Sequence, residues 1–133
     1  MTAAVPASPP PSVRRYEVRA ESTATFGRVL LSARGHHVII DGPEQNGCPG
    51  EEITPVELLL GGVATCGVEL LHVIAREQGV GLGGVTTRVR GMVDRSKQPR
   101  TDVTVFTSVH VGFALRGVDG AQAAALVEGF KRR

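Results

Sequence analysis

The chain has 133 residues, enough for one domain that buries a modest core without a disulfide framework. Aromatic residues make up only 4% of it, so Val, Leu, Ile and Ala must fill that core. With a net charge of +2 and no dense Lys/Arg block, nothing in the composition argues for a nucleic-acid partner.

Residues 1–12 are rich in Ala, Pro and Ser and contain no apolar run of signal-peptide length, so we expect a disordered lead. A single domain is expected over 13–133. The longest apolar stretch, from Leu58 to Ala75, is interrupted by Gly, Glu and His and is predicted to be too polar for a membrane span. These features predict a cytoplasmic protein with no membrane partner, whose two cysteines serve thiol chemistry or plain burial.

Three strands are predicted in the first part of the chain, over 13–22, 24–33 and 36–41. The first alternates charged with apolar or small residues, which is typical of a strand with one wet face. Arg34-Gly35 is a turn signal between the second and third. Short links favour an antiparallel meander, and the Gly- and Pro-rich segment 42–53 predicts a loop.

A helix is predicted next, with Thr54 as its N-cap, Pro55 in its first turn and Glu57 at the position that completes a capping box. Gly79 supplies the stop. This segment has the strongest start and stop signals in the chain.

The remainder predicts a strand over 85–94, a turn over 95–101, a long alternating strand over 102–115, and a last helix over 120–130. Asp119 can cap that helix. Because the strands do not alternate singly with helices, the order indicates an α+β fold.

Cys66 lies near the middle of the predicted long helix. At about 100° per residue it shares a stripe with Leu59, Gly62, Leu70 and Val73, so one interpretation is a buried structural cysteine. The other is a reactive thiolate, which needs a cation or dipole from elsewhere in the fold. Glycines at 61, 62 and 67 would let another backbone or a substrate approach closely.

The motif Pro55-x-Glu57-Leu-Leu-Leu-Gly-Gly-x-Ala-x-Cys66 resembles the helix motif of the OsmC/Ohr family, the osmotically inducible protein C and organic hydroperoxide resistance proteins. The loop before it resembles the OsmC-like branch, and the likeness covers roughly residues 24–131. It implies an α+β fold in which a curved antiparallel sheet surrounds a long central helix. It also implies an intertwined homodimer with active sites at the interface.

The resemblance further implies a cysteine-based peroxidase that reduces organic hydroperoxides in oxidative-stress defence. Cys66 matches the position of the attacking cysteine, which becomes a sulfenic acid. In the family a second cysteine then forms a disulfide with it, and a dithiol reductant restores the enzyme. The family places that second cysteine after the helix predicted near Asp119. The chain ends at Arg133, which indicates either a truncation or a different resolving step, and Cys48 lies upstream in a loop.

A glutamate and an arginine polarise the thiol in this family. The glutamate stands ten residues before the cysteine, where this chain has Val56, so we take Glu57 as the candidate. On an ideal helix Glu57 faces away from Cys66, and its capping role is equally well supported; a kink at Gly61-Gly62 would bring it round. The remaining acidic and basic candidates are Glu51, Glu52, Arg19, Arg28 and Arg34, the arginines without a matching motif.

The histidines give no metal site by their spacing. His36 and His37 with Cys48 resemble no zinc pattern, and His72 is about 120° from Cys66 around the helix. His110 falls on the opposite face of its strand from Val109 and is expected to be exposed. No cofactor is predicted. Two alternatives stay open beside the peroxidase: a redox-silent protein that binds a lipid or other small ligand, and a structural module whose Gly-rich face serves dimer contact.

Overall fold

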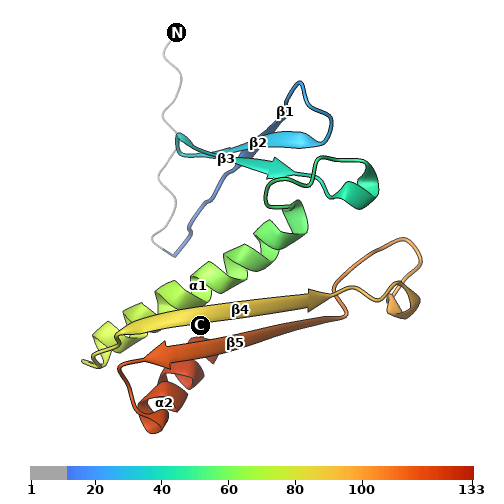
Figure 1. Cartoon of the computed structure of the whole chain (residues 1–133). Helices are drawn as coiled ribbons and strands as arrows, with labels where there is room; N and C mark the ends of the chain where they lie inside the picture. Colours follow the sequence, from blue (N-terminus) through green and yellow to red (C-terminus); the bar gives the residue numbers. More distant parts are fainter. Residues whose placement is uncertain (1–11) are drawn as a thin grey trace. The chain divides into compact units, whose positions relative to one another are not determined.

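A computed structural model describes residues 12–133, so the lead predicted over 1–12 lies, apart from Ser12, outside the described residues. The fold has the predicted α+β composition, with two α-helices and two antiparallel sheets (Figure 1). The chain divides into two compact units, one ending at Thr54 and one beginning at Pro55. The strands form one antiparallel sheet in each unit.

The first unit is built on the predicted meander. Strands β1 (Arg19–Ser22), β2 (Arg28–Ala33) and β3 (His36–Asp41) pair in that order, all antiparallel. Arg34 and Gly35 form the two-residue hairpin turn with φ of 51° and 80°, as a tight turn between right-twisted strands requires.

β2 starts four residues later than predicted because a turn occupies residues 23–27, whereas β1 ends at the predicted residue and starts six residues late, at Arg19. The Thr23 hydroxyl accepts a hydrogen bond from the Thr25 amide and donates one to the Arg28 carbonyl. These bonds take the backbone groups that a longer strand would have paired.

Helix α1 (Pro55–Glu77) begins at the predicted residue and ends two residues before Gly79, whose φ is 67°. Its buried positions are Gly67, Leu71, Ile74 and Ala75. By length and composition alone α1 is apolar enough to cross a membrane, which corrects the expectation that this stretch is too polar. The core helix of a soluble protein passes the same test, and the second half of α1 packs in the core of its own unit.

Strands β4 (Gly84–Met92) and β5 (Ser108–Arg116) form the second sheet, with Arg88 opposite Gly112 in the register. β5 starts six residues later than the strand predicted from Asp102. The Gln98 side chain explains the difference: it donates to the Val105 carbonyl at 3.1 Å and accepts from the Val105 amide at 2.6 Å. At Val105 a side chain thereby takes the place of a partner strand.

Helix α2 (Gly120–Lys131) has Asp119 as its N-cap, and Gln122 completes a capping box. The core of the second unit lies where α1, α2 and the β4–β5 sheet meet, and it contains Leu71, Ile74, Ala75 and Leu126. Phe113 of β5 meets Phe130 of α2 edge-on, with ring centroids 5.1 Å apart.

Candidate functional site

The Cys66 side chain is exposed on α1, and the stripe predicted to bury it is not the buried one. Leu59, on the predicted stripe, is 62% exposed. The buried stripe begins at Gly67, one residue and therefore about 100° further round the helix. The close approach of Phe113 decides the orientation: a Cβ added at Gly67 would lie 2.9 Å from the ring.

An exposed thiol answers one of the questions that the sequence leaves open. In this structure Cys66 is not a core residue, so plain burial does not account for it. Within residues 55–133 its sulfur has no hydrogen-bond partner. The neighbouring Thr65 hydroxyl donates back to the Gly61 carbonyl at 2.8 Å, so it is turned along the helix.

Glu57 lies in the first turn of α1, nine residues before Cys66. The helix runs without interruption from Pro55 to Glu77, so no break at Gly61-Gly62 carries Glu57 round to the cysteine (Figure 1). Nine residues of helix separate two positions by about 13.5 Å along the axis. The role of Glu57 beside the thiol therefore remains a prediction, and a single copy of α1 does not bring the two side chains together.

A hollow of about 320 Å³ lies beside α1, against β4. Ala64, Thr65, Val68, Glu69 and Thr87 line it. The Thr87 hydroxyl oxygen is buried and has no hydrogen-bond partner among the described residues. A buried hydroxyl without a partner costs free energy, which a polar group that reached it would recover. Thr87 could not be singled out from the sequence, because its hydroxyl is buried only when β4 packs on α1.

The structure distinguishes the three candidate arginines, all in the first unit. Arg19 forms an ion pair with Glu21 of the same strand, and Arg34 occupies the β2–β3 turn. Arg28 makes a two-pronged contact with Asp41, Nε to Oδ1 at 2.8 Å and Nη2 to Oδ2 at 2.9 Å. Arg28 is therefore already engaged by a carboxylate of its own sheet.

Asp41 is fully buried and organises the loop that follows β3. Besides Arg28, the amides of Glu51 and Glu52 donate to its Oδ2 at 3.0 and 3.1 Å. The hydrogen bond from Arg28, assisted by the two amides, lowers the pKa of Asp41 from 3.8 to about 2, against the opposing effect of burial. The alternatives Glu51 and Glu52 thus hold the loop in place through their backbones, and the Glu51 carboxylate also pairs with Arg28 at 3.5 Å.

Cys48 is a free, half-buried thiol in the same loop. Its side chain fills the space left by Gly27 and Gly42, where an added Cβ at either position would overlap it. His36 and His37 are exposed on β3, and the His37 ring lies 2.6 Å from the Ser32 hydroxyl. Across residues 12–133 no group of three or more His, Cys, Asp or Glu side chains is placed to hold a metal ion.

Comparison with known proteins identifies the class. The sequence profile of the OsmC-like protein family matches residues 48–133. The chain belongs to this family, as the helix motif predicts. No protein among the curated sequences matches it.

Three solved structures illustrate the likeness of the fold. An OsmC-like protein from Mycoplasma pneumoniae is 13% identical, with a TM-score of 0.73 over 90% of this chain and 82% of its own. An organic hydroperoxide resistance protein from Elizabethkingia anophelis is 14% identical, with a TM-score of 0.68 over 89% and 81%. One from Legionella pneumophila is 20% identical, with a TM-score of 0.59 over 88% and 82%. At these identities the likeness concerns the fold alone.

Proposed function

We propose that the protein is a cytoplasmic thiol peroxidase that reduces organic hydroperoxides through Cys66. The observation that carries the proposal is that the Cys66 thiol, which the motif resemblance aligns with the family's attacking cysteine, is exposed. Membership of the family and the hydroperoxide resistance proteins among the similar folds support it.

The reaction starts with the Cys66 thiolate attacking the terminal oxygen of the hydroperoxide. An S–O bond forms and the O–O bond breaks, so the sulfur is oxidised to a sulfenic acid while the alkoxide leaves and takes up a proton. A dithiol then attacks the sulfenic sulfur and expels water. Its second thiol breaks the mixed disulfide and restores the Cys66 thiol. A small dithiol supplies both thiols, so this route does not need a resolving cysteine from the chain.

A homodimer is part of the proposal. The first half of α1 exposes apolar side chains to an unusual degree for a core helix, and these are Val56, Leu58, Leu59 and Val63. Nothing lies within 4 Å of a Cβ added at Gly61 or Gly62, so a second copy of the helix has room to approach. Sedimentation of the protein at micromolar concentration tests this, and a monomer throughout would remove the homodimer from the proposal.

The catalytic proposal is tested by titrating the reduced protein with cumene hydroperoxide in the presence of a sulfenate-trapping reagent. We expect one trapped sulfenate per chain in the parent and in Cys48→Ser, and none in Cys66→Ser. Turnover is then followed with dithiothreitol as the dithiol. A Cys66→Ser variant that consumes hydroperoxide as fast as the parent would contradict the assignment.

The second candidate is a redox-silent protein that binds a lipid or other small apolar molecule. The hollow beside α1, with the unpartnered Thr87 hydroxyl, is the observation that favours it. Alkylation of Cys66 measured against pH separates the two, because a peroxidase needs a substantial thiolate population at neutral pH. Slow alkylation at pH 7 together with retention of a fatty acid would favour the binding protein.

A further inference from the structure

The face of the β4–β5 sheet that points away from α1 carries positive charge. Thr87 and Phe113 face α1 at Gly67, so the residues next to them on each strand face outwards. On β4 these outward residues include Arg88 and Arg90, and on β5 they include His110 and Gly112. The register sets Arg88 opposite Gly112 and Arg90 opposite His110.

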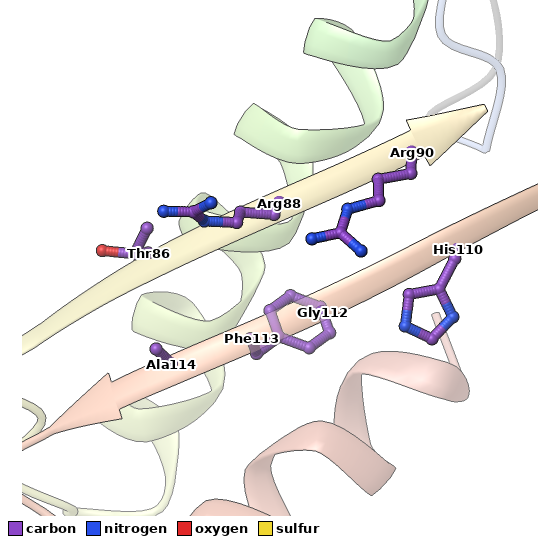
Figure 2. A pocket seen from close by; sticks show the side chains of 7 residues that line it. All are labelled: Thr86, Arg88, Arg90, His110, Gly112, Phe113 and Ala114. Atoms are coloured by element: carbon purple, nitrogen blue, oxygen red, sulfur yellow. The ribbon is translucent and has the colours of Figure 1, made fainter.

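A hollow of about 240 Å³ lies on this outer face. Its lining residues are Thr86, Arg88, Arg90, His110, Gly112, Phe113 and Ala114. Figure 2 shows Arg90 reaching from β4 towards β5, with the His110 ring beside it and Arg88 lying along β4 towards Thr86. Gly112 keeps the hollow open, since the nearest atom to a Cβ added there is the Arg88 carbonyl oxygen, 4.0 Å away.

The two arginines lack the counter-charge that other arginines of the chain have. Among residues 12–133, no carboxylate lies within 4.0 Å of Arg88 or Arg90, and no acidic residue lines the hollow. Other arginines do pair with carboxylates, namely Arg19, Arg28, Arg100 and Arg133. Side chains two apart on a strand share a face, so Arg88 and Arg90 repel one another until an anion lies between them.

We infer that this outer face binds a small phosphate-bearing molecule. A guanidinium group can bind two phosphate oxygens at once. Two such groups on one strand, beside a histidine, supply more hydrogen-bond donors than one carboxylate would use. Thr86 also lines the hollow, and its hydroxyl accepts a hydrogen bond from Arg116 at 3.2 Å. A hollow of about 240 Å³ has the size of a compact anion and is shorter than the extended track that a nucleic-acid strand follows.

The site is independent of the peroxidase proposal, because it lies on the opposite face of the sheet from α1 and uses none of the residues around Cys66. Binding is measured by calorimetry at low ionic strength, with inorganic pyrophosphate as the probe. We expect saturable binding by the full chain and by Cys66→Ser alike. Absence of binding at millimolar pyrophosphate would overturn the inference while leaving the catalytic proposal intact.

Two variants locate the site. The double variant Arg88→Gln/Arg90→Gln removes the charge, and Gly112→Val fills the hollow without changing the charge. The double variant should weaken pyrophosphate binding at least about tenfold, since losing even one charged hydrogen bond has that effect. Gly112→Val should weaken it measurably by occupying the space of the anion. The matched control is Arg95→Gln/Arg100→Gln, which removes two charges from the β4–β5 connection of the same unit and should leave affinity within about twofold.

Three outcomes would overturn the inference even if pyrophosphate binds. They are equal weakening in the control, unchanged binding by Gly112→Val, and tighter binding of a single-stranded oligonucleotide that competes for the same face. Gly112→Val keeps the test valid if the double arginine variant does not fold, since a β-branched side chain suits a strand and has room at this position.

Discussion

The two units of the chain bury different kinds of residue. From Pro55 onwards the buried side chains are apolar and come from both helices: Leu71, Ile74, Ala75 and Leu126. Before it, among the described residues, the buried side chains are Ile40 and the charged Asp41. The second unit is therefore stabilised mainly by removing apolar surface from water, whereas the first depends on a hydrogen-bonded ion pair that fixes β2, β3 and the following loop.

The difference teaches where each unit is vulnerable. An apolar core fails when volume is removed from it, because the neighbours relax only in part. A polar network fails when one partner loses its charge, because the other partner is left buried without compensation. Perturbations that act on volume or on charge should therefore affect the two units separately.

Among the predicted changes in stability, the largest is expected for Leu71→Ala. Leu71 is fully buried between the helices and the sheet, so truncation should lower the free energy of unfolding by about 2–5 kcal/mol. Urea unfolding followed by NMR, with one probe in each unit, measures it. The matched control is Leu59→Ala at a position 62% exposed, which should cost less than about 1 kcal/mol in a monomer.

A loss for Leu59→Ala as large as that for Leu71→Ala would show that a partner covers Leu59 in solution, in keeping with the proposed homodimer. A Leu71→Ala variant as stable as the parent would contradict the core described for the second unit.

The next largest change in stability is expected at low pH and should be confined to the first unit. The pKa of Asp41 is lowered from 3.8 to about 2 in the folded protein, so the carboxylate favours folding above pH 3.8. This contribution declines as the pH falls below 3.8 and is lost below about 2, where Asp41 is protonated in both states. The NMR signal of Ile40 should report earlier urea unfolding at low pH, whereas that of Leu126 reports the second unit.

Asp41→Asn is the control for this acid sensitivity. It should destabilise the first unit at pH 7, by less than Leu71→Ala costs the second because Arg28 remains partly in water, and it should remove this part of the pH dependence. An acid transition of Ile40 that is unchanged in Asp41→Asn would assign the sensitivity to another group.

A pair of identical substitutions in α1 should have opposite effects. Gly67→Ala places a methyl group 2.9 Å from the Phe113 ring and should cost about 1–3 kcal/mol. Gly61→Ala meets nothing within 4 Å and should stabilise the helix by about 0.5–1 kcal/mol. Thermal unfolding of both variants checks the signs, and stabilisation by Gly67→Ala would mean that Phe113 moves aside readily.

The smallest change in stability is expected for Thr87→Val. The substitution keeps the side-chain shape and removes a buried hydroxyl that has no partner among the described residues, so stability should rise by up to about 1 kcal/mol. Unfolding in urea measures the gain. A loss of stability would show that the hydroxyl has a partner in solution, and a gain accompanied by weaker fatty-acid retention would support the alternative ligand-binding function.

Features with local signals were predictable from the sequence. Strand β3 has its predicted limits because Arg34-Gly35 fixes the turn before it and the Gly/Pro loop ends it. Helix α1 starts at Pro55 as predicted, since proline is favoured in a first turn and forbids an earlier start of the hydrogen-bond ladder. The family motif lies in this helix, so membership of the family was also predictable.

Features that depend on distant partners were not predictable. The alternation over 102–107 is that of a strand, yet the Gln98 side chain takes both backbone hydrogen bonds of Val105. Residue spacing could not predict whether the α1 face that carries Cys66 is buried or exposed, because apolar residues surround much of the helix. The contact between Gly67 and Phe113 decides which side is buried. The pairing of Arg28 with Asp41 appears only once the β2–β3 register is known.

The position of the Cys48 side chain between Gly27 and Gly42 affects how readily reagents reach its thiol. Its half-buried sulfur takes up the room that two missing side chains leave, so a bulky electrophile should reach it much more readily when the loop opens. The chain therefore holds two thiols with unequal access under native conditions, and brief treatment with a maleimide dye should mark one site per molecule at Cys66. Uptake of a second equivalent of dye only in denaturant would report the fraction of molecules in which the loop around Cys48 has opened. Labelling of Cys48 would therefore measure local opening of this loop.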